Sequence, residues 1–545
     1  MANKRYANKN KSKFNKDKSR MTGDRDSRSI TKGRSFEEKM ADPKIHRSES
    51  NDPAWYMQWP SLAQSAANIP MNRLPGTPLH VSSGPKNLQI PGMMSIGLLP
   101  SIGWSYDQTD APNVMANAIY NYVRHVNSGH SNYDAPDLMM YILAVTNLVG
   151  FHSWMRRCYG TLRLISPTNR YYPKVCAAAN GIDYNDFISH MADFRFYINN
   201  FALRMGTFVV PGVMPLVARQ SFAFSGMYLD ENDPKGQLYQ YQPIGFYRLD
   251  AYGANGTTLK FEKFPDEAFT LATLSAYGDK LLAPLVANED FAIMSGDILK
   301  AFGDGGIIHL SMTDEDYVVM PSHDTMVLEQ IANTRTIPYS DMDAASLDIT
   351  QDPKVGGGAI RFTPVTTTEH ADIVDRWLGH ELMLNFHTDN VDVPFIMDAT
   401  RNTIGTIKAK FSDLNSGAER VYLKAVGTEI PIETKIYTIS EDGLSYETIT
   451  LSMAEGFDMK DGQSLEFLRT WTKSKLKIFS LVSSFNYHPV VQTGVVVGES
   501  GEGDYFTSLW DFNNYTMVNI DDIHRIHQVA IYSEMTIPMA VVTSK

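Results

Sequence analysis

Hydrophobic side chains recur every three or four residues over most of the range 111–205, which predicts a series of helices. Asp110-Ala111-Pro112 and Asp134-Ala135-Pro136 each place a capping acid and an early proline before an apolar run. We therefore expect one helix from residue 111 and a second that runs to about Cys158. A third should begin at Asp183, with an apolar face at three- and four-residue steps: Phe187, Met191, Phe194, Ile198 and Phe201. Further helices are predicted near 265–287 and 291–302.

The second predicted helix contains 18 residues without a fixed charge, from Leu138 to Met155. That length reaches the lower limit for a transmembrane helix. However, the run includes polar side chains such as Asn147 and His152, and Arg156-Arg157 follows it directly. We interpret it as a buried helix of a large core, and we expect no stable membrane insertion.

Two regions that flank the predicted helices lack a helical period. Prolines recur from Pro60 to Pro100, so we expect residues 60–110 to form an extended strap over a domain surface, with short strands at most. Residues 225–260 combine tyrosines with turn-forming residues and are predicted to form an ordered loop or small insertion. Such a segment suits either a protein–protein interface or packing on its own domain, and the sequence leaves both open.

After residue 350 hydrophobic side chains recur at every second position and no longer at every fourth, which predicts strands. Short strands are expected at 359–363, 406–411 and 421–424. Glu433–Ile439 and Leu444–Leu451 flank Asp442-Gly443, a pattern typical of a hairpin turn. The C-terminal part should alternate strand-like runs, such as Val490–Val497, with a short helix near Asp521–His527.

These patterns predict an α+β fold with a mainly helical domain and a separate β-rich domain, preceded by a disordered basic arm. The expected organisation comprises an arm at 1–50, a mainly helical domain at 51–350, a β-rich domain at 355–460 and a C-terminal segment returning to the helical domain at 461–545. Within the helical domain, 111–205 is the expected helical core and 225–260 the tyrosine-rich loop.

Composition narrows the class of protein. The chain has 545 residues, 43% of them hydrophobic and 20% charged, which excludes a collagen, a coiled-coil rod and a wholly disordered chain. Its two cysteines cannot build a disulfide framework, and the charged N-terminus lacks the apolar segment of a secretory signal. We therefore expect a large, soluble, cytosolic protein.

Charge is distributed unevenly along the chain. Residues 1–50 hold 15 Lys and Arg against 7 Asp and Glu, whereas the remainder holds 34 against 54. An apolar-poor segment of this kind cannot offset the entropy of ordering, so the arm is expected to be disordered and to contact a polyanion. A solubilising or targeting leader and a membrane-surface contact are the alternatives. The residues predicted to contact nucleic acid, without reading its sequence, are Lys4, Arg5, Lys9, Lys11, Lys13, Lys16, Lys18, Arg20, Arg25, Arg28, Lys32 and Arg34.

No catalytic constellation stands out, and we predict neither a catalytic residue nor a metal site nor a cofactor. The glycine-rich run 498–503 carries two glutamates and lacks the Lys-Ser/Thr of a phosphate-binding loop. His524 and His527 have a spacing compatible with two metal ligands, but a solvated helix face is the favoured interpretation. Cys158 and Cys176 lack CxxC spacing and are expected to be buried thiols.

Several long strings resemble picobirnavirus capsid proteins. They are Asn121–Tyr133 (NYVRHVNSGHSNY), Asp137–Tyr141 (DLMMY), Phe151-His152-Ser153, Glu289–Asp297 (EDFAIMSGD) and Lys300–Gly303 (KAFG), with Asn51-Asp52 and Ala54-Trp55-Tyr56 after the basic arm. The resemblance is strongest over 110–155 and 285–305 and extends loosely from 51 to about 345.

The resemblance implies a structural protein of a double-stranded RNA virus. Members of the family build a small T=1-type icosahedral shell from intertwined dimers, each subunit having a helical shell domain and a β-rich protruding domain. It further implies that the arm lies near the viral RNA inside the particle and is a candidate for proteolytic trimming. The partners would be further copies of the chain, viral RNA and an encapsidated viral polymerase, and the location the virion, with assembly in the host cytoplasm. The alternatives are a cytosolic RNA-binding nucleoprotein that forms no closed shell, and an enzyme with a basic leader.

Overall fold

The computed structural model of the chain divides into two units, Met1–Asn72 and Arg73–Lys545. In the first unit it describes helix α3 (Pro60–Ala67), and the predicted basic arm lies outside the described residues. The account below concerns the second unit. The described residues are 60–69, 78–79, 88–89, 92–127, 129, 132–163, 172–231, 236–253, 256–351, 358–439, 446–451, 454–459, 478, 481–497, 503–509 and 513–538.

The first two predicted helices begin at the expected residues, as α4 (Ala111–Val126) and α5 (Ala135–Leu162). Each has proline in its first turn, where no backbone N–H donor is needed. The Asp134 and Asp137 side chains form a reciprocal capping box at the start of α5. Local sequence therefore determines where both helices start.

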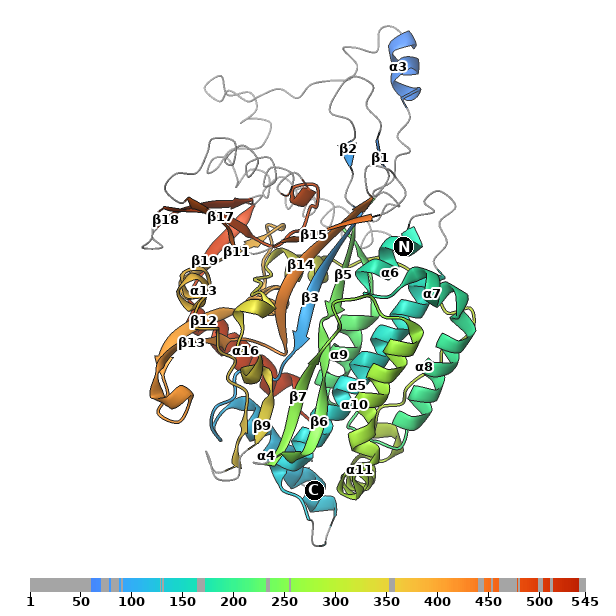
Figure 1. Cartoon of the computed structure of the whole chain (residues 1–545), viewed down its shortest axis with the longest axis vertical. Coiled ribbons are helices and arrows are strands. Elements are labelled where there is room, and N and C mark those ends of the chain that lie inside the picture. Colours follow the sequence, from blue (N-terminus) through green and yellow to red (C-terminus); the bar gives the residue numbers. More distant parts are fainter. Residues whose placement is uncertain are drawn as a thin grey trace, which may run out of the picture. The chain divides into compact units, whose positions relative to one another are not determined.

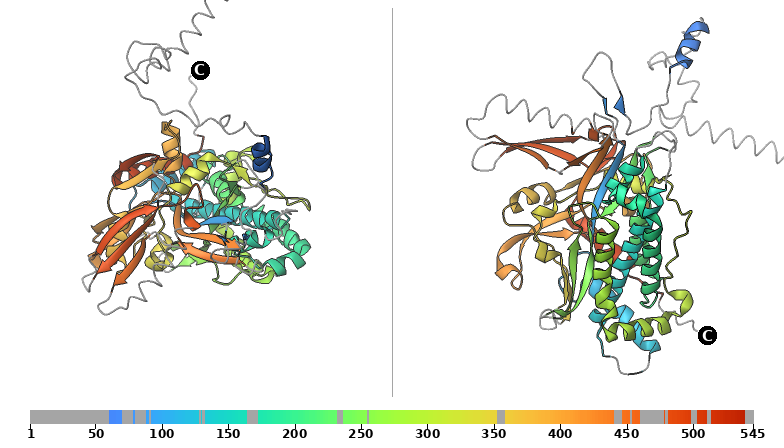
Figure 2. Two further views of the ribbon diagram at one scale, coloured as in Figure 1. Left: turned by 90° about the horizontal axis from the view of Figure 1, so that it is seen from above. Right: turned by 45° about the vertical axis from the view of Figure 1, so that its right-hand side comes forward.

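Helix α5 forms the centre of the core (Figure 2). It packs against the surrounding helices and against strands of a neighbouring sheet. By length and apolar composition alone it could cross a membrane, and its most apolar 18-residue window is completely buried inside the protein. The prediction of a buried core helix is confirmed. At Gly150 the rings of Phe224 and Phe246 approach α5, and an added Cβ would lie 3.3 Å from Phe246.

The predicted third helix is split into α7 (Tyr184–Ser189) and α8 (Met191–Met205), with His190 between them. Its predicted apolar side chains face inward, and only Met191 among them is partly exposed. Helices α10 (Leu271–Val286) and α11 (Glu289–Phe302) also form as predicted. The remaining helices of this layer are α6 (Tyr172–Ala179) and α9 (Pro215–Ser225).

A six-stranded mixed sheet borders the helices, with the strand order β15-β14-β3-β5-β4-β8 (Figure 1). Strand β3 (Met93–Pro100) runs parallel to β5 (Leu238–Pro243) and antiparallel to β14 (Glu429–Ile439), and all its residues are buried. The prediction of a surface strap was therefore wrong for this segment. A strand covered on both faces carries a continuous apolar run, so it shows no alternation that sequence inspection could detect.

The prediction of a tyrosine-rich loop over 225–260 was also wrong. These residues form β4 (Tyr228–Leu229), β5, β6 (Gly245–Gly253) and β7 (Gly256–Lys263). Buried tyrosine hydroxyls are satisfied internally: Tyr241 donates to Gln330 Oε1 at 3.0 Å and Tyr247 to the carbonyl oxygen of Leu347 at 2.9 Å. Of the two interpretations left open, packing within the segment's own fold is the one observed for these side chains.

The β-rich second half is confirmed as far as it is described. Strand β12 (Gly405–Lys410) pairs with β13 (Glu419–Ala425), and β14 pairs with β15 (Tyr446–Leu451) as the predicted hairpin. The turn 440–445 lies outside the described residues. The shorter elements are β1 (Pro78–Leu79), β2 (Leu88–Gln89), β8 (Ser322–His323), α12 (Thr325–Ala332), β9 (Ile349–Gln351), β10 (Ile360–Arg361), α13 (Ala371–Leu378), β11 (Leu382–Phe386), α14 (Val393–Ala399), β16 (Ala454–Met459), β17 (Val491–Val497), β18 (Gly503–Leu509) and β19 (Asn514–Val518).

The fold class is α+β, as predicted. The last helix, α16 (Ile520–Glu534), covers the predicted helix at 521–527 and packs against α4, α9 and β13. Strand β14, from the predicted β-rich range, lies beside β3 in the central sheet. The division into domains at 51–350, 355–460 and 461–545 stays a prediction.

Candidate functional site

The twelve predicted RNA-binding residues, Lys4 to Arg34, lie outside the described residues. Among the residues that the structure does describe, no three His, Cys, Asp or Glu side chains gather as a metal site. His527 is fully buried, and its Nε2 donates to the carbonyl oxygen of Thr403 at 2.8 Å. His524 Nδ1 donates to the carbonyl oxygen of Lys424 at 3.0 Å. A solvated helix face was therefore the wrong interpretation for His527, which joins α16 to the core.

Both cysteines are buried free thiols, as predicted. Burial raises the pKa of Cys158 and of Cys176 to about 12, so neither forms a thiolate at neutral pH. These side chains serve as small apolar core residues.

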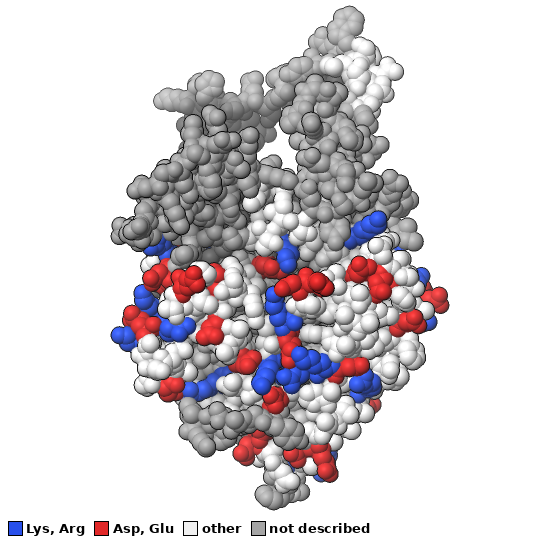
Figure 3. Space-filling view, in the orientation of Figure 1, with Lys and Arg blue, Asp and Glu red and all other residues white. Residues whose placement is uncertain are grey.

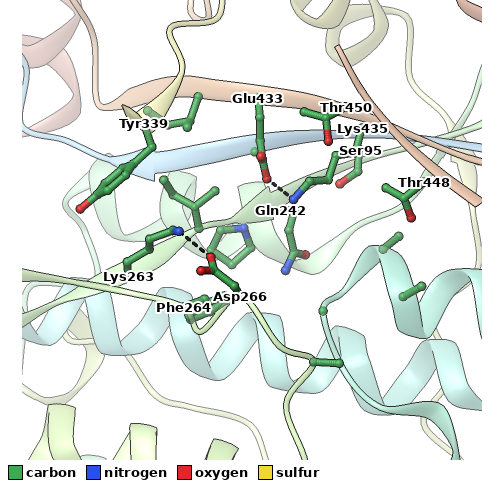
Figure 4. Close-up of a pocket in the computed structure, with 18 of the residues that line it drawn as sticks. Ser95, Gln242, Lys263, Phe264, Asp266, Tyr339, Glu433, Lys435, Thr448 and Thr450 are labelled. Carbon is green, nitrogen blue, oxygen red and sulfur yellow. Dashed lines mark hydrogen bonds and ion pairs between the residues drawn. The ribbon is translucent and has the colours of Figure 1, made fainter. Parts of the chain in front are cut away.

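A pocket of about 530 Å³ lies against the central sheet (Figure 4). Adjacent strands contribute Ser95, Gln242 and Thr450 to its lining. Its lysines are already paired: Lys263 contacts Asp266 at 2.7 Å and Lys435 contacts Glu433 at 2.5 Å. With Glu267 also in the lining, the pocket has three acidic side chains and two lysines that are already paired, so it presents no free cation to an anionic ligand.

A second surface is apolar and lies on the outer side of α8. Phe196 and Leu203 are 71% and 63% exposed, although the opposite side of the same helix is buried. They are seven residues apart, which places them on one face two turns from each other. Single exposed apolar side chains are common, but a row of them on one helix indicates a contact surface.

An apolar groove of about 360 Å³ adjoins this face of α8. Val145 and Val149 of α5 line it together with Leu203, Leu299 and Met312, and the last three are substantially exposed. We call Phe196, Leu203, Leu299 and Met312 the α8 surface.

The far wall of the groove is formed by the segment after α11. Two backbone hydrogen bonds hold that segment in place, from Gly212 N to the Gly306 oxygen at 3.0 Å and from Ile308 N to the Val210 oxygen at 3.2 Å. The groove is therefore bounded on that side by a hydrogen-bonded backbone segment.

Ionisable side chains near the α8 surface include Asp304 and His309, which line the groove 3.8 Å from each other. Arg204 lies beside Leu203 but is paired with Asp279 of α10 at 2.5 Å. On the molecular face drawn in Figure 3, acidic and basic side chains are interspersed over the centre and form no large patch of one sign. This arrangement suits protein contacts better than direct binding of a polyanion by that face.

Sequence inspection missed the α8 surface. The predicted apolar face contained Phe194, Ile198 and Phe201, and the structure buries all three. Phe196 and Leu203 fall on the other side, where a solvated helix would carry polar side chains. Two large apolar residues on the polar side of the pattern were the feature that could have revealed the surface.

Three comparisons with known proteins each match this chain to picobirnavirus capsid proteins. A model of the picobirnavirus capsid protein family matches residues 55–452. The capsid protein precursor of human picobirnavirus (strain Human/Thailand/Hy005102/-) is 27% identical over 517 residues, which span 90% of this chain and 92% of that protein. The X-ray crystallographic structure of the picobirnavirus capsid matches with a TM-score of 0.72 at 22% identity, covering 90% of this chain and 100% of that chain. The structural match shows a shared fold.

Proposed function

The chain belongs to the picobirnavirus capsid protein family, and we propose that this viral capsid protein assembles with copies of itself, as dimers, into a small icosahedral shell around double-stranded RNA. It is a structural protein of the virion and not an enzyme, as its relatives are capsid proteins. The observation that carries the proposal is the α8 surface, where exposed apolar side chains lie beside a groove with an apolar floor. Closed shells require such surfaces, because repeated contacts between copies exclude water at apolar centres.

We propose that the basic N-terminal arm contacts the RNA. It holds 15 Lys and Arg against 7 Asp and Glu, while the rest of the chain is acidic. One arm binds phosphates weakly and without sequence preference, but many arms in one closed cavity act at high local concentration. The acidic body keeps the inner wall from adhering to the duplex. We further propose that assembly takes place in the host cytoplasm and that a viral polymerase is encapsidated with the RNA.

Negative-stain electron microscopy of the purified full chain tests the proposal, together with the ratio of absorbance at 260 and 280 nm. We expect closed particles of uniform diameter that contain nucleic acid. Filaments or single subunits on RNA would favour a non-assembling nucleoprotein instead. A protein that stays monomeric in every buffer, with or without RNA, would contradict the proposal.

A further inference from the structure

The outer side of α8 combines a projecting apolar side chain with an apolar recess. Phe196 projects from the first half of the helix and is 71% exposed. The groove bounded by Leu203, Leu299 and Met312 lies at the C-terminal end of the same helix. A projection and a recess on one helix satisfy the requirement for a self-complementary two-fold contact, in which each copy supplies both halves.

We propose that α8 packs antiparallel against α8 of a second copy of this chain, with Phe196 of each copy in the groove of the other. This inference rests on the proposed self-assembly and specifies one of its contacts. A two-fold axis between Asn199 and Asn200 brings Phe196 opposite Leu203 of the second copy. Position 192, an exposed alanine, then lies opposite position 207, next to Gly206.

The side chains along this contact fit close packing. The exposed positions of α8 are Ala192, Asp193, Phe196, Asn200 and Leu203, so Asp193 is the only charged residue among them. Ala192 and Gly206 are small and lie at the two ends, which permits an interaxial distance of about 8–10 Å. Asn200 lies beside the axis, where it can form a hydrogen bond with its counterpart.

Charges beside the contact do not oppose it. Arg204, next to Leu203, pairs with Asp279 on the same copy at 2.5 Å, and the two ionisable residues that line the groove, Asp304 and His309, lie 3.8 Å from each other. The recess itself is apolar at its floor, because Val145 and Val149 of α5 are buried beneath it. An aromatic ring entering the groove therefore replaces water against aliphatic side chains without leaving a charge unpaired.

Cysteine cross-linking tests the geometry directly. In the full-length Phe196→Cys/Leu203→Cys variant, the two cysteines of one chain are two helical turns apart, about 10 Å, and too far for a disulfide. Mild oxidation should therefore yield a covalent dimer on a non-reducing gel, and each single variant should yield almost none. The native Cys158 and Cys176 are buried and free, so they provide no background reaction.

A second variant measures the energetic importance of the contact. Phe196→Asp should raise the dissociation constant of the dimer by about 100-fold, as expected for an aromatic residue at the centre of an interface. Its circular dichroism spectrum should match that of the unmodified chain, because the ring is exposed in the single subunit. Val393→Asp is the matched control, since Val393 is 70% exposed on α14 and distant in sequence. It should associate like the unmodified chain.

The outcomes separate the two proposals. If the unmodified chain forms particles, but the double cysteine variant does not cross-link and Phe196→Asp associates normally, the α8 contact is wrong and self-assembly stands. If the unmodified chain neither associates nor forms particles, both proposals fail. Cross-linked dimers together with a dissociating Phe196→Asp variant support the α8 contact.

Discussion

Arg157 lies in the core and is held by neutral acceptors. Its side chain donates to Asn180 Oδ1 at 3.0 Å, to the Tyr241 carbonyl oxygen at 2.6 Å and to Gln242 Oε1 at 2.9 Å. Burial lowers its pKa to about 10, so the guanidinium remains charged at neutral pH. One residue of α5 thereby connects the C-terminal end of α6 with β5.

Replacing Arg157 should destabilise the fold strongly. Arg157→Met removes the guanidinium from three buried acceptors and leaves Gln242 Oε1 with only the Trp154 indole N–H at 3.3 Å, so we expect a loss of about 3 kcal/mol or more. Arg157→Lys should lose a comparable amount, since one ammonium cannot reach three acceptors in the guanidinium geometry. Urea denaturation followed by circular dichroism measures both. Arg525→Met, at a side chain 74% exposed, is the control and should change stability by less than about 0.5 kcal/mol.

Two buried histidines predict a loss of stability in acid. Burial lowers the pKa of His152 and of His527 to about 3, from the ordinary 6.5. The unfolded chain therefore binds protons that the folded chain excludes, so this stability is present above about pH 6.5 and is lost as the pH falls toward 3. Each histidine should contribute a slope of up to about 1.4 kcal/mol per pH unit in that window.

The comparison of His527→Gln with the unmodified chain isolates one of these contributions. Between about pH 6 and pH 4.5 the variant should lose stability less steeply, because one titrating group is absent. Equal slopes for both proteins would contradict a neutral, buried His527. Unfolding free energies from denaturant titrations at several pH values supply the measurement.

At the scale of elements, α16 is the clearest example of a helix held by residues distant in sequence. Gly103 has a φ of +74°, and a Cβ there would collide with Ile531 of α16. Near the end of α16, Glu534 lies 3.6 Å from Arg401 and 3.9 Å from Arg219 of α9. Arg219 also donates three hydrogen bonds to Glu429 of β14, at 3.0, 3.2 and 2.9 Å. This buried cluster joins a helix, a strand and the C-terminal helix.

Removing one charged side chain from that cluster should lower the free energy of unfolding more than removing two oppositely charged side chains together. Arg219→Met leaves the buried carboxylate of Glu429 unpaired, and we expect a loss of about 3–5 kcal/mol. The double variant Arg219→Met/Glu429→Leu removes both charges and should recover most of that loss. Thermal and urea unfolding of the two variants measure the difference. A double variant as unstable as the single one would show that packing, not the unpaired charge, sets the cost.

At the scale of the whole molecule, the opposite charges of arm and body predict separate contributions to assembly and packaging. Deleting residues 1–50 should leave particle formation intact and lower the RNA content, because the deletion removes a net positive segment from an otherwise acidic chain. Electron microscopy and the 260/280 nm absorbance ratio measure the two effects.

A full-length variant with the twelve basic arm residues changed to Gln keeps the length of the arm and changes its net charge from +8 to −4. It should lose RNA to the same extent as the deletion. Undiminished RNA of full length in either variant would mean that the arm is not the packaging element. Release of RNA from intact arms should also increase with salt concentration, since phosphate contacts depend on counterion release.

The sequence by itself determined the features that depend on neighbouring residues. The starts of α4 and α5 follow from Asp-Ala-Pro triplets, and the β14–β15 hairpin from period-two strands around Asp-Gly. The family resemblance likewise rests on contiguous strings. Capping, proline geometry and side-chain periodicity act within a few residues, so they can be inferred without knowing the fold.

Only the tertiary structure decided which segments are covered on both sides and which remain open. Strand β3 is central because β14, more than 300 residues later, pairs with it. The hydroxyls of Tyr241 and Tyr247 donate hydrogen bonds to residues in distant segments of the chain. His527 is buried by partners that sequence spacing cannot reveal. Phe196 stays exposed because no segment of its own chain covers it in the described structure. Burial depends on contacts between residues far apart in the chain, and only folding brings those residues together.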